Sequence, residues 1–262
     1  MIVDVHAHLE LLPQGKLDDV LKRAKENNVE TIVTNGIDRD SNRYALGLSK
    51  KNSMIRPALG IYPTNITNAD EKINEEIEFI RKENPCAIGE VGLDYKEEAW
   101  QTDEKKSLQK ECFRELIEIS KKKSIPIIIH SRKAEADAID ILETSSLKPN
   151  KVIMHCFSGN FKLVKRIRDN GWNFSIPTNI VNSEHFQKLV SETNLSQLYT
   201  ETDTPFLSPF RTNRKLVDPE SEYDVNEPSN IVHTIKKISE IKKMDPIEVE
   251  NIIYMNYKKN FD

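Results

Sequence analysis

Two histidines separated by one residue are the first side chains in the sequence with evident chemical potential. His6 and His8 follow the apolar segment "MIVDV" at the start of the chain. Because side chains i and i+2 of a strand point to the same side, both imidazoles can face one point just beyond a strand end. This geometry suits a divalent metal ion, although ordinary surface histidines at a polar strand end would give the same pattern.

Further histidines and carboxylates follow other apolar runs. They are Glu90 in "AIGEVGLDY", His130 in "IPIIIHSR", His155 in "VIMHCFSG" and Asp203 in "LYTETDTPFL". Taken singly, such a histidine can be a hydrogen-bonded core residue and such a carboxylate a helix cap. Taken together, four of the six histidines and two carboxylates fall at the ends of predicted strands. The other two, His185 and His233, fall in helical patterns, and we interpret them as structural.

Four imidazoles and two carboxylates are enough ligands for two divalent ions with open positions for water. This mixture of nitrogen and oxygen ligands suits Zn, Mn, Co or Ni, and Mg less readily. A pair of such ions stabilises the charge that develops on a phosphoryl or carbonyl oxygen during attack by water. The residues therefore predict a metal-dependent hydrolase.

Alternating strands and helices are predicted to position these residues. Apolar runs predict strands at 1–6, 30–36, 54–61, 86–92, 125–130, 151–157, 173–177 and 198–202. Amphipathic patterns predict helices at 16–28, 70–84, 103–123, 133–144, 160–170, 183–191, 228–243 and 246–260, and 203–227 reads as a long loop. Eight such units favour a single-domain (β/α)8 TIM barrel over residues 1–262, in which the C-terminal strand ends carry the active site. The alternative is an open doubly wound sheet, but no GxGxxG motif supports a dinucleotide fold.

The composition indicates which partners the protein can bind and in which cellular compartment it works. The net charge of −4 and the isoelectric point near 6.0 argue against a broad basic face, so any contact with nucleic acid would be local. Three scattered cysteines indicate a reducing compartment, and we expect a cytoplasmic protein. No apolar run approaches the roughly 20 residues that span a bilayer, and no signal-peptide pattern is present. We expect no membrane association and a monomer.

The sequence resembles the TatD family of metal-dependent hydrolases, within the amidohydrolase-like superfamily. The matching segments are "DVHAHL" (4–9), "AIGEVGLDY" (87–95), "IPIIIHSRKA" (125–134), "IMHCFSG" (153–159), "ETDTPFLSP" (201–209) and "NEP" (226–228). They run in order through nearly the whole chain. The resemblance implies a metal-dependent deoxyribonuclease with 3′ to 5′ exonuclease action on single-stranded DNA ends.

The resemblance also implies a ligand set for two divalent ions per chain. His6, His8 and Asp203 would hold one ion, and His130 and His155 the second. Glu90 would bridge the two, where many relatives use a modified lysine. Asp203 would in addition accept a proton from the attacking water, as a carboxylate beside a metal can do.

Two departures from the family pattern bear on nuclease activity more than on metal binding. Tyr62 in "GIYPTN" stands where the family often has a histidine, and could act only as a neutral donor. The acidic "SEYDVNEP" replaces an often basic stretch, so that Glu222 and Asp224 stand where the family has cations. Arg211, Arg214 and Lys215 lie slightly earlier and could substitute for them.

Several residues near the ligands are candidates for substrate contact. Arg132 could grip a phosphate, or form a salt bridge within the following helix. Phe157 and Tyr95 could stack on a base, although buried packing is an equal alternative for Phe157. Ser158, with Gly159, could expose backbone N–H groups to an anion at the start of a helix. Glu201 is predicted to orient a neighbouring ligand rather than to bind metal.

Two other functions remain compatible with the residues. The same ions could hydrolyse a carbonyl substrate such as an amide or an aminoacyl ester. A non-catalytic barrel with a structural metal is the third hypothesis. It is disfavoured because a structural site needs only four ligands and closes its coordination sphere.

Overall fold

The computed structural model describes residues 1–66, 71–210 and 225–262. Of the sequence-based candidates, Arg211, Arg214, Lys215, Glu222 and Asp224 lie outside the described residues.

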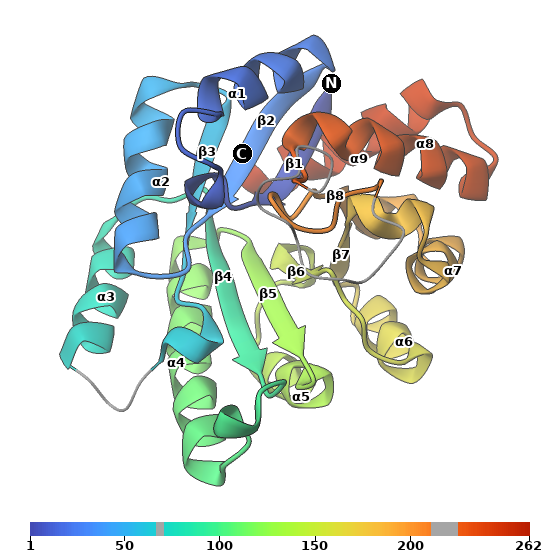
Figure 1. Cartoon of the computed structure of the whole chain (residues 1–262). Coiled ribbons are helices and arrows are strands. Elements are labelled where there is room, and N and C mark those ends of the chain that lie inside the picture. The colour runs from blue at the N-terminus through green and yellow to red at the C-terminus, as the bar shows by residue number, and fades with distance from the viewer. Residues whose placement is uncertain (67–70, 211–224) are drawn as a thin grey trace.

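Eight parallel strands form one sheet in the order of the chain, with each strand paired to its successor (Figure 1). The strands are β1 (Ile2–Ala7), β2 (Val29–Asn35), β3 (Ile55–Leu59), β4 (Ala87–Asp94), β5 (Ile127–Arg132), β6 (Val152–His155), β7 (Asn173–Ile176) and β8 (Leu198–Thr200). The chain after β8 returns to β1 through a parallel bridge between Ala7 and Thr204, so the ring nearly closes. The predicted (β/α)8 barrel is confirmed.

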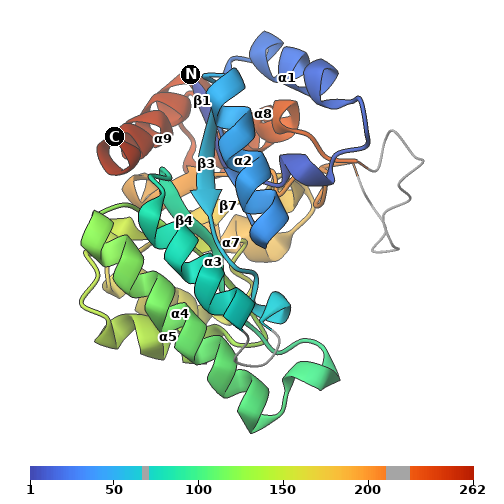
Figure 2. The ribbon, with the colours of Figure 1, turned by 90° about the vertical axis from the view of Figure 1, so that its left-hand side faces the viewer.

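Helices surround the strands on the outside (Figures 1 and 2). They are α1 (Leu17–Glu26), α2 (Arg39–Lys51), α3 (Glu71–Lys82), α4 (Asp103–Lys123), α5 (Glu135–Thr144), α6 (Phe161–Asp169), α7 (Glu184–Glu192), α8 (Ile231–Lys242) and α9 (Pro246–Phe261). Helix α2 was not predicted from the sequence, because its buried face is made of Ser41, Asn42 and Ala45 rather than of large apolar residues. None of the described helices is long and apolar enough to cross a membrane.

Buried side chains, mostly apolar, fill the inside of the barrel. A cluster that includes Val5, Val33, Ile128 and Ile153 draws members from seven of the eight strands. Strands that far apart around the ring can touch only across its axis. Phe261 and Tyr257 of α9 join this cluster. The candidate site therefore rests on a packed interior rather than over a pore.

Two glycines allow the strands around Glu90 to approach closely. A Cβ atom on Gly60 would lie 2.4 Å from the Glu90 carbonyl oxygen. Gly92 has φ +141°, and a Cβ atom there would lie 2.0 Å from the carbonyl oxygen of His130, its partner in the β4–β5 pair. Any larger residue at either position would push β3, β4 and β5 apart where Glu90 and His130 project.

Candidate metal centre

The six predicted ligands come together at the C-terminal ends of the strands. His6 Nε2 lies 3.1 Å from His8 Nε2 and 3.5 Å from Asp203 Oδ1. One ligand atom from each of these three residues lies within 4.8 Å of the others, and the same holds for Glu90, His130 and His155. Two groups of nitrogen and oxygen donors thus form, each with the size and chemistry of a divalent cation site.

Glu90 stands between the two groups, with one carboxylate oxygen directed to each. Its Oε2 lies 3.2 Å from His8 Nε2 and 3.5 Å from His6 Nε2. Its Oε1 lies 2.8 Å from His130 Nδ1 and 3.8 Å from His155 Nε2. A carboxylate in this position has the geometry needed to bridge two ions.

Three of the four imidazoles also have an acceptor on the nitrogen that faces away from the cluster. The pairs are His8 Nδ1 with the Asn35 carbonyl oxygen (3.0 Å), His155 Nδ1 with Glu201 Oε2 (2.8 Å) and His130 Nε2 with Asp94 Oδ2 (3.1 Å). A carbonyl or carboxylate oxygen can only accept, so the outer nitrogen carries the proton. The lone pair of the inner nitrogen then faces the cluster, which is the tautomer that a metal ligand requires.

A buried carboxyl group joins the ends of β1 and β8. Asp4 Oδ1 accepts hydrogen bonds from the backbone N–H of His6 (3.2 Å) and of Thr202 (3.0 Å). The backbone N–H of Asp203 donates to the His6 carbonyl oxygen at 2.8 Å. Burial raises the pKa of Asp4 to about 8. These contacts keep His6 and Asp203 in register, although they stand almost 200 residues apart in the chain.

Burial and mutual charge shift the ionisation of the cluster. Burial raises the pKa of Asp203 to about 6. Burial also raises the pKa of Glu90, but hydrogen bonds from His130 and His6 outweigh it and hold that pKa well below its usual range. For His155, burial lowers the pKa, but the Glu201 carboxylate outweighs it and raises the pKa to about 9. Because a ligating imidazole must be neutral, binding of a cation at this cluster would displace protons.

Asp94, at the end of β4, joins three residues beside the second group of donors. Arg132 donates to Asp94 Oδ2 through Nε (2.8 Å) and Nη2 (2.6 Å), and the Tyr62 hydroxyl donates to the same oxygen at 3.0 Å. Arg132 therefore pairs with a residue of the neighbouring strand β4. The alternative prediction, a salt bridge within the helix that follows Arg132, is wrong. Sequence reasoning missed Asp94, whose signal was its position at a strand end.

One of the predicted substrate contacts is corrected by the structure, and a second is narrowed. The Phe157 side chain is 1% exposed and packs on Phe174 with ring centroids 5.9 Å apart, so it offers no face to a base. Ser158 is exposed, but the N-terminus of α6 is capped by Asn160, whose side chain accepts from the N–H groups of Lys162 and Leu163. Those two N–H groups are therefore not available to an anion, and a contact through Ser158 and Gly159 themselves stays a prediction.

Glu201 lies where a residue that orients a ligand should lie. Its carboxylate accepts from His155 Nδ1, from the Ser175 hydroxyl and, at 3.0 Å, from the Cys156 backbone N–H. Its distances to His6 and His155 would also allow it to bind a cation. Because its oxygens already accept these hydrogen bonds, the orienting role fits the contacts better.

The segment that contains "NEP" fastens the region after β8 to the rest of the barrel. Asn226 Nδ2 donates to the Thr202 carbonyl oxygen (2.7 Å) and to Thr178 Oγ1 (2.8 Å). The Glu227 carboxylate accepts from Nε and Nη2 of Arg23 in α1, at 2.6 to 2.9 Å. Asn226 and Glu227 therefore hold the site in place through these hydrogen bonds, and they are not needed as ligands or catalytic groups.

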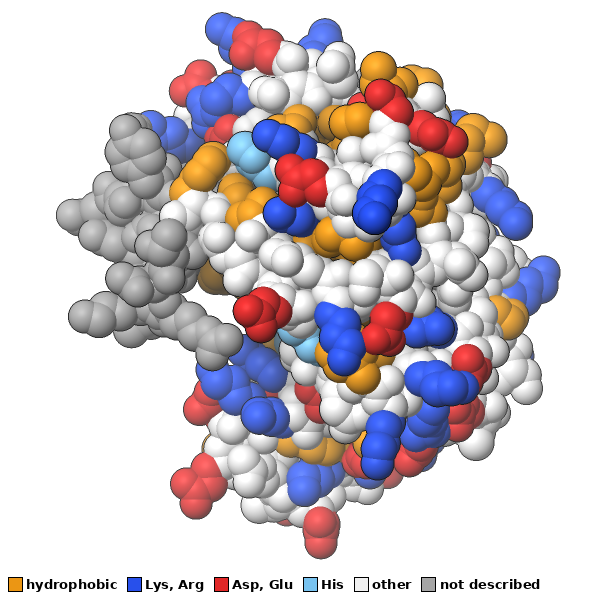
Figure 3. All heavy atoms as spheres, turned by 90° about the vertical axis from the view of Figure 1, so that its right-hand side faces the viewer, with side chains coloured by type: hydrophobic (Ala, Val, Ile, Leu, Met, Phe, Trp, Pro, Cys, Tyr) orange, Lys and Arg blue, Asp and Glu red, His pale blue; other side chains and the backbone are white. Residues whose placement is uncertain are grey.

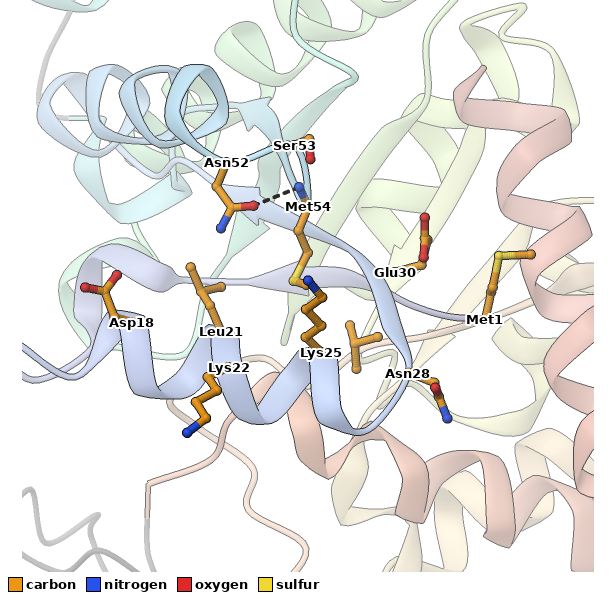
Figure 4. A pocket seen from close by; sticks show the side chains of 11 residues that line it. Met1, Asp18, Leu21, Lys22, Lys25, Asn28, Glu30, Asn52, Ser53 and Met54 are labelled. Carbon is orange, nitrogen blue, oxygen red and sulfur yellow. Dashed lines mark hydrogen bonds between the residues drawn. The ribbon is translucent and has the colours of Figure 1, made fainter.

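The remaining surface offers no rival centre among the described residues. Basic and acidic side chains are interspersed over the face formed by α6, α7 and α8 (Figure 3). A hollow of about 660 Å³ lies beside α1 at the opposite end of the barrel, and its walls include Lys22, Lys25, Asn28 and Met54 (Figure 4). It gathers no cluster of histidine or carboxylate ligands.

Comparison with known proteins places this geometry in a family. Residues 3–262 match the family model described as TatD related DNase. The chain is 35% identical over 263 residues to the uncharacterized metal-dependent hydrolase MJ1582 of Methanocaldococcus jannaschii, which covers 99% of this chain and 96% of that protein. It is 31% identical over 271 residues to the deoxyribonuclease TATDN3 of Homo sapiens, and this match covers 99% of this chain and 94% of that protein.

A solved structure shares the fold. The crystal structure of YJJV, a TatD homologue from Escherichia coli, superposes with a TM-score of 0.85 at 21% identity and covers 99% of this chain and 97% of that one. The predicted family resemblance is confirmed by the sequence comparisons, and the barrel by this structural one.

Proposed function

The chain belongs to the TatD related DNase family, and we propose that it is a metal-dependent phosphodiesterase that shortens single-stranded DNA from its 3′ end. The observation that carries the proposal is the position of Glu90, whose two oxygens face two separate groups of imidazole nitrogen. The name of the human relative, a deoxyribonuclease, supports DNA as the substrate class.

We assign one divalent ion to His6, His8 and Asp203, and a second to His130 and His155, with Glu90 shared between them. The mixed nitrogen and oxygen donors suit Zn, Mn, Co or Ni, with Mg less favoured. When bound, the ions supply Lewis-acid stabilisation of the charge on the phosphoryl oxygen.

Asp203 is the residue best placed to accept the proton of the attacking water. Its side chain is the most exposed of the six, at 15%, whereas that of Glu90 is 4% exposed. Water can therefore reach Asp203, whereas Glu90 is enclosed by the imidazoles. A carboxylate at hydrogen-bond distance from the nucleophile can serve as its general base.

Arg132 and Tyr62 are the proposed contacts for the phosphate. The Arg132 side chain is 43% exposed, and Asp94 occupies only its Nε and Nη2 edge. Nη1, which takes no part in these contacts, can donate to a phosphate oxygen. Burial raises the pKa of Tyr62, so its hydroxyl stays protonated, and it would donate to a phosphate by turning its one proton away from Asp94 Oδ2.

The wider setting is also part of the proposal. We propose a single domain over residues 1–262 that works as a monomer in the cytoplasm. Three free cysteines fit a reducing compartment. The mixed charges seen in Figure 3 and the net charge of −4 favour a local contact with a DNA end over a broad nucleic-acid face.

The test is cleavage of single-stranded DNA labelled at its 5′ end. Metal is removed with a chelator and Mg, Mn or Zn is then restored. We expect stepwise shortening only when metal is restored, resistance of circular single-stranded DNA, and loss of activity in Glu90→Ala. Glu30→Ala is the matched control, because Glu30 is exposed and lines the hollow at the opposite end of the barrel.

The amount of bound metal decides how a negative result is interpreted. Protein shown by elemental analysis to hold two ions per chain, and yet inactive on DNA with every metal, would refute the nuclease assignment. Carbonyl substrates would then be the next class to test. Cleavage of circular DNA would support phosphodiesterase activity but would refute exonuclease action.

A further inference from the structure

Two phenylalanines remain exposed in the short segment that follows Asp203. Phe206 is 40% exposed and Phe210 is 56% exposed. Single exposed apolar side chains are common on proteins and need no explanation in themselves. Phe206 differs from them in the way it is supported and in what it borders.

The backbone around Phe206 is held by hydrogen bonds from several directions. The donors and acceptors are His8 N–H with Thr204 O (2.8 Å), Phe206 N–H with Asp203 O (2.7 Å), Asn226 N–H with Pro205 O (2.9 Å) and Thr178 Oγ1 with Leu207 O (2.6 Å). Three of these bonds reach other parts of the chain, namely His8 directly after β1, the "NEP" segment and the short helix Thr178–Val181 after β7. An aromatic ring on so fixed a support loses little conformational entropy when a ligand binds to it.

The ring of Phe206 borders the metal cluster directly. Its centroid lies 6.5 Å from that of His8, and the two ring planes meet at 66°, so the rings make an edge contact. Phe206 is also only three residues from Asp203. A flat group that rested on Phe206 would therefore lie beside the ions assigned to His8 and Asp203.

We propose that Phe206 is the stacking platform for the base at the 3′ end of the substrate. The inference rests on the proposed function and specifies the substrate contact that the buried Phe157 cannot make. Every nucleobase has a π-face, so stacking tolerates any base. It also requires a base released from its helical neighbours, which favours single-stranded ends over paired ones.

The experiment compares two substrates on three variants. The substrates are an oligonucleotide with a normal 3′-terminal nucleotide and the same oligonucleotide with an abasic one. The variants are Phe206→Ala, Phe206→Tyr and the matched control Phe210→Ala, whose ring packs on His233 of α8 instead of His8.

We expect Phe206→Ala to raise KM about tenfold on the normal substrate, which is the usual scale of one lost stacking contact. For the wild type, the abasic end should raise KM by a similar factor. Phe206→Ala should therefore cause little further rise in KM on the abasic substrate. Phe206→Tyr should keep the wild-type KM and Phe210→Ala should leave both substrates unaffected. A Phe206→Ala loss that is equal on both substrates would overturn the proposal, as would an unchanged KM.

Binding without cleavage separates this inference from the proposed function. An oligonucleotide with 2-aminopurine at its 3′ end reports stacking as fluorescence quenching, and needs no turnover. Stronger quenching by wild type than by Phe206→Ala supports the platform even if no DNA is cleaved. Equal fluorescence with the two proteins refutes it, whereas failure of cleavage alone refutes only the nuclease assignment.

Discussion

Replacing Asp94 by asparagine removes the charge on which three side chains beside the cluster converge. The Oδ2 atom of Asp94 accepts from His130, Arg132 and Tyr62, and Oδ1 accepts from the Lys96 N–H at 2.9 Å. Burial raises the pKa of Asp94, but the hydrogen bonds from His130 and Arg132 outweigh it and hold the pKa below its usual range. An asparagine has only one acceptor oxygen. If that oxygen faces Lys96, its NH₂ group meets the other donors.

We expect Asp94→Asn to lower metal affinity, because Asp94 is the acceptor for His130 Nε2. Without an acceptor on Nε2, the imidazole no longer favours the tautomer whose Nδ1 lone pair faces Glu90. Loss of such an outer partner typically lowers metal affinity by about 10- to 100-fold, which is about 1.4–2.7 kcal/mol. The free energy of unfolding should fall by only about 1–2 kcal/mol, because Arg132 is 43% exposed and can turn to water.

The assay is competition for metal with a chromophoric chelator, on the folded wild type and variant, together with urea unfolding. We expect weaker binding of one of two ions in Asp94→Asn. Arg132→Gln is the control, because it removes the cation but leaves the contact between His130 and Asp94, so its metal affinity should match the wild type. Equal affinity in folded Asp94→Asn and wild type would refute the reasoning.

Three further predictions concern backbone fit and pH. Gly60→Ala should lower metal content and activity, because its Cβ atom would lie 2.4 Å from the Glu90 backbone; full metal loading by elemental analysis would contradict this. Gly47→Ala, in α2 with no atom within 4 Å of the added Cβ, should raise stability by up to about 1 kcal/mol in urea unfolding. Burial, and then Lys236, lower the pKa of His233, so the unfolded chain binds more protons below pH 6.5. The contribution of His233 to stability should therefore fall from pH 7.5 to 5.5, so the urea midpoint of the wild type should drop relative to that of His233→Gln over this interval; a constant difference between the two midpoints would contradict the assignment.

The strands and the six candidate ligands could be predicted because their signals are local. Each strand is a short apolar run, and His130 and His155 each follow one directly. Helix α2 could not be predicted in the same way. Its start is set by the capping box of Asp38 and Ser41, and its fully buried residues include no large apolar side chain from which a helical period could be recognised.

The partners of the polar side chains could not be predicted, because they lie on other strands. Arg132 meets Asp94 from the neighbouring strand β4, and no pattern within β5 specifies that pairing. The burial of Phe157 could not be predicted either. It depends on Phe174 from β7, which packs against this ring.

The chemical inventory and its location at one end of a barrel were therefore contained in the residue types and their spacing along the chain. Tertiary structure alone decided that the two oxygens of Glu90 face different groups, and that acceptors set the tautomers of His8, His130 and His155. The physical reason is that periodicity reports only which side of its own element a residue occupies. Hydrogen-bond partners from distant segments meet only when the ring of strands closes and excludes water from between them.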